Sequence, residues 1–167
     1  TVSGYFDNLE TMASEAVKLA QYAPAIYFVP NPIKPALLAR AANRIRPAGD
    51  RDPTTSDADI TERRWLLIDA DPIRPAGISS SDEEHEAAIQ KAKEIRAWLT
   101  LDDWPDPILA DSGNGGHLMY PLVSTPVGTD LVKRALEALA WRFDDDVVHI
   151  DVTVFNPARI WKLYGTP

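Results

Sequence analysis

The sequence predicts an α+β fold, in which strands and helices alternate around one sheet. Three observations predict it: short apolar runs that end in turn residues, segments with an apolar period near 3.6 residues, and an ordinary globular composition of 45% apolar and 25% charged residues. Their order is strand, helix, hairpin, helix and strand, a split βαβ arrangement. At 167 residues the chain is of single-domain size, and about the first 60 residues form a small N-terminal α/β subdomain.

The N-terminal subdomain has two helical patterns that flank one strand. Residues 5–22 repeat apolar side chains near the helical period, which predicts the first helix. Residues 25–29, AIYFV, predict a short buried strand, because Pro and Asn residues close it. Pro35 suits the first turn of a second helix that runs to about residue 45, and residues 47–59 read as a polar loop.

The remaining residues predict the main sheet and its two helices. Residues 64–70, RWLLIDA, form an apolar strand that ends in carboxylates. After a loop at 72–81, Ser81 caps a helix over 82–101, with Glu84 as its capping-box partner. Residues 107–110 and 117–122 flank a glycine-rich turn as a hairpin. A helix follows at about 126–143, then a strand at 147–154 and a further strand at 158–164.

The composition excludes several classes of protein. Without cysteine the chain has neither disulfides nor thiolate metal sites, so a bound metal would use oxygen or imidazole ligands. A reducing cytoplasm is the expected setting. Since no apolar run is long enough to cross a bilayer, we expect no membrane partner. The chain begins at Thr1 and stops directly after a strand-like run, so we expect a fragment of a longer protein.

The net charge of −8 argues against simple nucleic-acid binding, which usually needs a basic surface. The charge is uneven, however, because acidic residues gather at 81–94 and 144–146 and leave a basic stretch before them. This stretch is a candidate surface for a template strand, and the alternative is an ordinary solvated helix face. Its basic residues are Lys34, Arg40, Arg44, Arg46 and Arg51, followed by Arg63 and Arg64 just ahead of the acidic strand.

The strand at 64–70 runs into an Asp-Ala-Asp sequence. Alternate side chains of a strand share a face, so Asp69 and Asp71 point the same way at its end. Two carboxylates on one face suit Mg²⁺ or Mn²⁺, and burying them without a cation or hydrogen bonds is costly. A solvated acidic turn that ends the strand is the alternative interpretation.

The turn of the predicted hairpin, DSGNGGH, is unusually rich in glycine. Glycines at 113, 115 and 116 let the backbone turn tightly, and successive N–H groups of such a turn bind anions. Ser112 and His117 lie at its two ends and suit phosphate oxygens. We therefore expect a nucleotide phosphate site here, and a plain Asn-Gly hairpin turn is the alternative. Its candidate nucleotide-binding residues are Ser112, Gly113, Asn114, Gly116 and His117.

The segment HIDVTVFNPARIWKLYGT, residues 149–166, supplies a third carboxylate. Asp151 lies between Ile150 and Val152 in a predicted strand, where a charge is unusual unless it is paired. It completes a possible three-carboxylate cluster with the Asp-Ala-Asp sequence, which suits a pair of ions about 3.5–4 Å apart. Arg159 and Lys162 add charge for phosphate, with solvated strand positions as the alternative.

These segments, in this order, resemble the archaeo-eukaryotic primase superfamily, in particular the primase-polymerases of plasmids, phages and some CRISPR loci. Its motif I is a DxD, as at residues 69–71, and its motif II is similar to SGNGGH at 112–117. Its motif III is an acid with apolar neighbours, as at 150–152. The run FNPARIWKLYGT at 155–166 is similar to the NPxRIxRxxGT run of many members, with Lys162 where Arg is common.

The resemblance spans roughly residues 63–166 and implies a fold, a site and an activity. The fold would be an RRM-like antiparallel or mixed sheet with flanking helices over about 61–167, after the N-terminal subdomain. Asp69, Asp71 and Asp151 would hold two Mg²⁺ or Mn²⁺ ions, with Ser112 and His117 on the triphosphate of the incoming nucleotide and Arg159 on phosphate. The activity would be template-dependent nucleotidyl transfer, as a DNA primase, a DNA polymerase or both.

The expected partners are a single-stranded DNA template, a primer, and dNTP or NTP, with helicase or helix-bundle domains in the full-length protein. Other functions stay open at this stage. The DxD also suits a metal-dependent nuclease or a nucleotidyltransferase that acts on a small acceptor, and a degenerate primase fold would serve as a nucleic-acid binding module. A Rep-type relaxase is disfavoured, because the sequence has no HxH pair.

Overall fold

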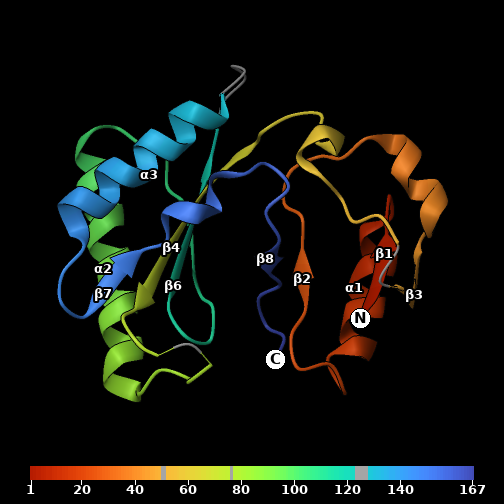
Figure 1. The fold of residues 1–167 in the computed structure, drawn as a ribbon, viewed down its shortest axis with the longest axis horizontal. Coiled ribbons are helices and arrows are strands. Elements are labelled where there is room, and N and C mark those ends of the chain that lie inside the picture. The colour runs from red at the N-terminus through yellow and green to blue at the C-terminus, as the bar shows by residue number, and fades with distance from the viewer. Residues whose placement is uncertain (50–51, 76, 123–127) are drawn as a thin grey trace.

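The computed structural model describes residues 1–49, 52–75, 77–122 and 128–167, and it has an α+β architecture (Figure 1). Its largest sheet has the strand order β5-β6-β4-β7, and every neighbouring pair is antiparallel. The chain passes through it in the order β4, α2, β5, β6, α3, β7, so the two inner strands are the first and the third. The elements are β4 (Trp65–Pro72), α2 (Asp82–Leu101), β5 (Ile108–Asp111), β6 (Gly116–Pro121), α3 (Thr129–Phe143) and β7 (Val148–Ile150).

Helices α2 and α3 cover the same face of this sheet (Figure 1). Small residues allow α2 to approach closely, because Ala88 and Ala92 are fully buried and lie against Gly116 of β6. Leu66, Ile68 and Ala70 face the same way from β4, since alternate residues of a strand share a face. This helix face forms the core, whose further members include Ile95, Leu99, Leu118, Tyr120, Leu136, Val148 and Ile150.

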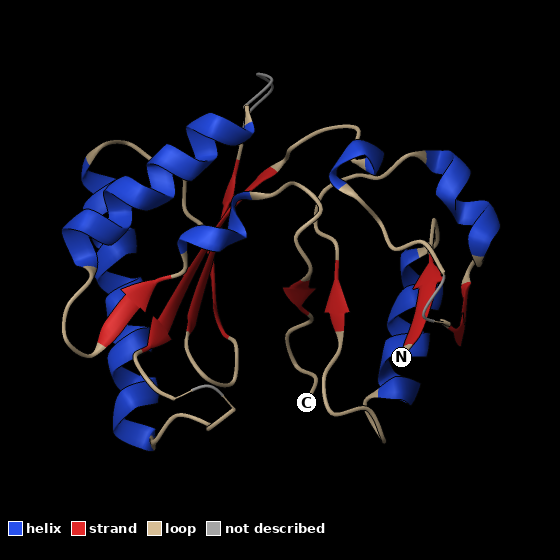
Figure 2. Ribbon diagram, in the orientation of Figure 1, coloured by secondary structure: helices blue, strands red, loops and turns tan. Residues whose placement is uncertain are grey.

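The N-terminal part builds a second unit, which lies on the other side of the sheet from the helices (Figure 2). Strands β1 (Val2–Tyr5) and β3 (Arg44–Pro47) pair antiparallel, and α1 (Leu9–Leu19) contacts β3. Strand β2 (Tyr27–Phe28) instead pairs with β8 (Trp161–Lys162), so the N-terminal part and the C-terminal segment meet between the units. Three short 3-10 helices are η1 (Pro35–Arg40), η2 (Asp57–Asp59) and η3 (Val152–Phe155).

Two polar side chains of the N-terminal part connect it to the main sheet. Asn31 is 3% exposed, and its Oδ1 accepts from the N–H groups of Arg64 and Trp65 at 2.8 and 3.2 Å. Its Nδ2 donates to the carbonyl oxygen of Pro157 at 2.9 Å. Asp57 accepts from the N–H of Ala158 at 2.9 Å. The beginning of β4 and the segment after β7 are therefore held to the N-terminal unit by partly buried hydrogen bonds.

Several predicted elements are confirmed and others are wrong. The strand that ends in Asp-Ala-Asp, the helix over 82–101 and the hairpin are present at or near their predicted bounds. The predicted helix at 35–45 is wrong beyond Arg40, because residues 44–47 pair with the unpredicted strand β1. The predicted start of the later helix, at about 126, lies outside the described residues, as does Arg51. Within the part of the chain that is described, no helix has the length and apolar character needed to cross a membrane.

Candidate active site

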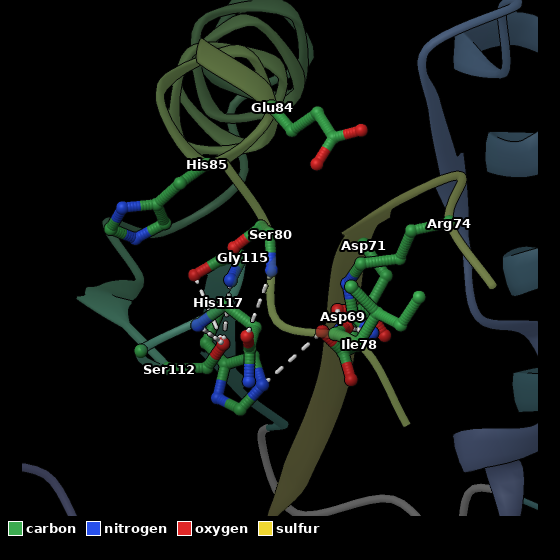
Figure 3. Close-up of polar contacts among 12 residues, drawn as sticks. Asp69, Asp71, Arg74, Ile78, Ser80, Glu84, His85, Ser112, Gly115 and His117 are labelled. Carbon is green, nitrogen blue, oxygen red and sulfur yellow. Dashed lines mark hydrogen bonds and ion pairs between the residues drawn. The ribbon is translucent and has the colours of Figure 1, made fainter. Parts of the chain in front are cut away.

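The face of the sheet opposite the helices carries the acidic residues of β4. Because Gly116 and its partner Ala70 face α2, the next residues in each strand, His117 and Asp69, face the other way. Asp71 lies on the same side, and the residue paired with it on β7 is His149. We call this side the carboxylate face. It brings the Asp-Ala-Asp sequence and His117, 46 residues later in the chain, onto neighbouring strands (Figure 3).

Asp69 lies directly opposite His117 and is 16% exposed at its side chain. The Nε2 of His117 lies 3.2 Å from Oδ1 of Asp69, but the direction of the ring N–H does not fit a hydrogen bond, so the two atoms are in close contact without one. Among the described residues, this buried Oδ1 therefore has no hydrogen-bond donor. A buried carboxylate oxygen without a donor is costly, so the site suits a cation or a further donor.

Asp71 occupies a different electrostatic setting, although it lies only two residues away. Burial, followed by the neighbouring charge of Asp69, raises the pKa of Asp71 above its ordinary value. Arg74 partly offsets this, with a guanidinium nitrogen 3.9 Å from Oδ1 of Asp71, and Arg74 also donates to the carbonyl of Ile78 at 3.0 Å. Two neighbouring carboxylates that share one arginine form a site that favours added positive charge.

Asp151 follows the end of β7 and does not lie within a strand, so the predicted strand at 147–154 is wrong after Ile150. Its N–H donates to the carbonyl of Asp69 at 2.9 Å, which places the backbones of the two acids side by side. Its side chain caps η3 by accepting from the N–H of Thr153 at 2.7 Å. This capping bond explains how the chain tolerates a charge here.

The glycine-rich turn is closed by its own serine. The Oγ of Ser112 accepts from the N–H of Gly115 at 2.9 Å and donates to the carbonyl of the same residue at 3.1 Å. Gly113 has a φ of +93°, a left-handed conformation that favours glycine. Asn114 accepts from the N–H of Ser80 at 3.4 Å, which connects the turn to the loop before α2 (Figure 3). The turn is therefore closed by Ser112 and joined by Asn114 to the loop before α2.

The two adjacent glycines of this turn have packing roles that the sequence analysis missed. A Cβ on Gly115 would lie 2.3 Å from the carbonyl oxygen of Ala70 and 3.1 Å from Oδ1 of Asp71. A Cβ on Gly116 would lie 2.7 Å from Cβ of Ala92 in α2. Gly115 thus brings the turn against the carboxylates, whereas Gly116 lies in the helix-packed core. A nucleotide-binding role for Gly116 would therefore have to use its main chain.

Helix α2 supplies a second contact to the turn. His85 of α2 is half-buried, and its Nε2 lies 2.9 Å from Oδ1 of Asp111. The same oxygen accepts from the N–H of Gly113 at 2.6 Å. Burial alone would raise the pKa of Asp111, but these two hydrogen bonds outweigh it and lower that pKa. Asp111 is 26 residues from His85 in the sequence, so the periodicity of the helix does not indicate this contact.

His117 lies between the carboxylate face and the C-terminal segment and is 5% exposed. Its ring stacks on Trp161 with centroids 3.9 Å apart and planes 27° from parallel. Its Nδ1 lies 3.3 Å from the hydroxyl of Tyr164, which in turn accepts from the indole N–H of Trp161 at 2.6 Å. Trp161 is 2% exposed, so its ring packs on His117 inside the protein.

A pocket of about 400 Å³ lies between the glycine turn and the C-terminal segment. Ser112 and Gly113 line it from the turn, and Lys162 and Tyr164 line it from the opposite segment. Lys162 also bonds to the carbonyl of Pro167 and lies over the ring of Tyr27, 6.0 Å from its centroid. Three residues predicted to bind nucleotide, Ser112, Gly113 and Lys162, are therefore brought together around one cavity.

The two predicted arginines nearest the site have structural partners. Arg159 donates to both the carbonyl and the hydroxyl of Thr153, at 2.6 and 2.8 Å, so it is held beside the turn that Asp151 caps. Arg63 donates to the carbonyl of Phe155 at 2.8 Å, and burial lowers the pKa of its guanidinium. Both side chains support the segment after β7.

The predicted nucleic-acid surface is spread over several elements. Lys34 is exposed at the residue before η1, and Arg44 is exposed on β3. Arg64 is exposed at the beginning of β4 and pairs with Glu62 at 2.7 Å. The alternative for the basic stretch, an ordinary solvated helix face, is wrong for Arg44 and Arg46, because they lie on β3. The candidate template surface stays a prediction.

The donor chemistry of the carboxylate face fits a hard divalent cation. Asp69 offers an oxygen without a described donor, and burial together with the charge of Asp69 raises the pKa of Asp71, so a cation would stabilise both carboxylates. In the part of the chain that the structure describes, no group of three or more His, Asp or Glu side chains is already arranged around one point as a metal site. The aspartates therefore fit a cation by their chemistry and placement, with Asp151 adjacent through its main chain.

Comparison with known proteins adds no relative. No protein-family model, curated protein sequence or solved structure matches this chain.

Proposed function

We propose that this chain is the catalytic core of a primase-polymerase, which joins nucleotides on a single-stranded DNA template. The observation that carries the proposal is the carboxylate face. There Asp69 and Asp71 share one side of β4, His117 lies directly opposite Asp69 on β6, and Gly115 packs on the main chain between the two acids. Residues suited to metal and to phosphate, remote in the sequence, are thus neighbours in space.

The sheet supports an RRM-like assignment for the catalytic module. The element order β-α-β-β-α-β, with the first and third strands innermost and both helices on one face, agrees with what the resemblance implies. The opposite face of such a sheet is then left for the site. Fold alone does not establish activity, so the side chains of the carboxylate face remain the main support.

In this proposal Asp69, Asp71 and Asp151 would hold Mg²⁺ or Mn²⁺. Bound there, the ions would activate a 3′-hydroxyl for attack on the α-phosphorus and neutralise charge on the departing pyrophosphate. The residues of the chain supply positioning and charge. The glycine turn and Lys162 border the pocket beside Ser112, which suits a triphosphate, and His117 presents an imidazole next to Asp69.

The test is templated incorporation of labelled nucleotides on primed single-stranded DNA, with Mg²⁺ or Mn²⁺. We expect Asp69→Ala and Asp71→Ala to abolish incorporation while the chain stays folded, because the carboxylates act on substrate and do not build the core. Asp146→Ala is a matched control, since Asp146 is exposed beyond the site. Normal extension by either variant in Mn²⁺ would overturn the assignment.

The same assay separates the rival functions. A nuclease would shorten the DNA, a transferase that acts on a small acceptor would consume nucleotide without a template, and a degenerate module would bind DNA equally well without divalent metal. Repeating the assay without primer, with dNTP, NTP and mixtures, shows whether the enzyme begins chains or only extends them. Templated products in either format support the proposal.

A further inference from the structure

The position of His117 raises the question of which ring nitrogen carries the proton. An imidazole that faces a carboxylate or a phosphate needs an N–H on that side, whereas a lone pair there would be repelled. Its other nitrogen, Nδ1, lies 3.3 Å from the hydroxyl of Tyr164 on the C-terminal segment. What that hydroxyl does therefore determines what His117 presents to the carboxylate face.

The hydroxyl of Tyr164 has a defined direction because of Trp161. An indole N–H is only a donor, so its 2.6 Å bond to Tyr164 makes the phenol oxygen the acceptor. The proton of the phenol is then left to donate, and Nδ1 of His117 is the acceptor within reach. Burial raises the pKa of Tyr164 to about 12, so this proton is retained at neutral pH.

We propose that Tyr164 is a positioning residue, which holds His117 in the tautomer protonated at Nε2 and so places that N–H on the side of the ring that faces the carboxylate face. The chain of donors runs from Trp161 through Tyr164 to Nδ1 of His117, and it leaves Nε2 as the nitrogen 3.2 Å from Oδ1 of Asp69. Stacking on Trp161 fixes the plane of the same ring. Trp161 therefore fixes the plane of the His117 ring and, through Tyr164, the nitrogen that carries its proton.

This arrangement suits a ligand with anionic oxygens. The N–H of His117 does not aim directly at the nearby carboxylate oxygen, so it can donate to a phosphate that reaches the carboxylate face. Tyr164 also lines the pocket that Ser112 and Lys162 border, so the positioning pair lies between that pocket and the acids. The phosphate ligand rests on the proposed function, whereas the tautomer of His117 does not.

The primary measurement is ¹⁵N NMR of the labelled imidazoles in the 167-residue chain at about pH 8, above the ordinary histidine pKa of about 6.5. We expect His117 to have a protonated Nε2 and an Nδ1 that accepts a hydrogen bond. In Tyr164→Phe the Nδ1 resonance should shift because that bond is lost. A proton on Nδ1 in the unsubstituted chain would overturn the inference, whatever the activity.

Two further variants separate positioning from packing. Tyr164→Phe leaves the indole N–H of Trp161 without its acceptor, so the double variant Trp161→Phe/Tyr164→Phe removes both polar groups together. Tyr120→Phe is the matched control, because it removes a buried hydroxyl that has no described hydrogen-bond partner and lies on the helix-packed side. Only Tyr164→Phe and the double variant should shift the Nδ1 resonance of His117.

Activity supplies the second measurement. We expect Tyr164→Phe to raise the nucleotide KM about three- to tenfold, the value of one hydrogen bond, with kcat changed less than about twofold. A KM equal to that of Tyr120→Phe would show that Tyr164 does not act on the site. If the tautomer is as stated but the chain incorporates no nucleotide, the proposed function fails and the assignment of His117 stands.

Discussion

Alternate residues of β4 and β6 face opposite sides of the sheet, and the two sides differ in almost every property. The helix face carries Ile68, Ala70 and Leu118, all fully buried against α2 and α3. The carboxylate face carries Asp69, Asp71 and His117 on the same two strands. The comparison shows that one strand pair both anchors the core and displays the chemistry, so the site inherits its rigidity from the packing behind it.

The adjacent glycines show how closely the two faces are coupled. Gly116 makes room for α2 on one side, and Gly115 lets the turn contact the main chain of β4 on the other. Neither position tolerates a side chain, yet the atoms that exclude it differ. At Gly116 the obstacle is a helix, whereas at Gly115 it is the carbonyl of Ala70 and the carboxylate of Asp71.

The largest expected effect is that of an alanine at either glycine. Gly115→Ala and Gly116→Ala should each lower the free energy of unfolding by about 3 kcal/mol, because a buried Cβ at 2.3 or 2.7 Å from its neighbour forces the structure to shift. Urea denaturation measures the loss. Gly49→Ala is the control, because a Cβ there meets no atom of the described residues within 4 Å, and we expect a change within about 0.5 kcal/mol.

A second substitution distinguishes the two faces. Ala92→Gly removes the nearest obstacle to a side chain at position 116, so the pair should show favourable coupling of about 0.5–1 kcal/mol in a double-mutant cycle. The same Ala92→Gly should not rescue Gly115→Ala. Equal coupling with both would show that the two glycines do not pack against separate faces.

The next largest effect should be a stabilisation by divalent cations that depends on the carboxylate face alone. A cation that binds only the folded chain adds about 2.7 kcal/mol at a concentration one hundred times its Kd. We expect Mg²⁺ or Mn²⁺ to raise the Tm of the unsubstituted chain, and EDTA to reverse the change. Asp69→Asn and Asp71→Asn should abolish the shift, whereas Asp146→Asn should keep it. An equal shift in all variants would place the ion elsewhere.

An element of the fold can be predicted from the sequence when the residues that determine it lie within that element. The helix over 82–101 is confirmed to the residue, because its capping box at Ser81 and Glu84 and its apolar period are all contained in the segment. The strand before it ends in carboxylates as predicted, with its bounds one or two residues later. The strand at 44–47 was missed because its pairing partner begins at Val2, and nothing in its own composition indicates that pairing.

The features of the candidate site also differ in whether they could be predicted from local sequence. Strand alternation alone placed Asp69 and Asp71 on one face, and the structure has them there. The sequence could not indicate that Trp161 packs on His117 or that His85 contacts Asp111, because each contact joins side chains on separate elements. The strand around Asp151 was overextended, since the capping bond to Thr153 that ends it is a detail of the turn.

The smallest effect concerns a carboxylate outside the site. Asp145 bonds to Lys91 of α2 at 2.6 Å and also accepts from two main-chain N–H groups before β7. These bonds, of which the one from Lys91 has the largest effect, lower the pKa of Asp145 to about 2. Burial and the charge of Asp69 instead raise the pKa of Asp71 on the carboxylate face. Asp145 thus joins α2 to the edge of the sheet, whereas the charged form of Asp71 lowers the stability of the folded chain.

The direction of the pH effect follows from the lowered pKa of Asp145. The unfolded chain gains a proton near the ordinary value of 3.8, before the folded chain does, so the stability that Asp145 contributes is present above pH 3.8 and lost as the pH falls toward 2. Because Asp145 is about half exposed, we expect Asp145→Asn to cost less than about 1 kcal/mol at pH 7 and less still near pH 3. Urea denaturation at the two pH values measures this difference. A cost that grows on acidification would mean that the pair does not fasten α2 to the sheet.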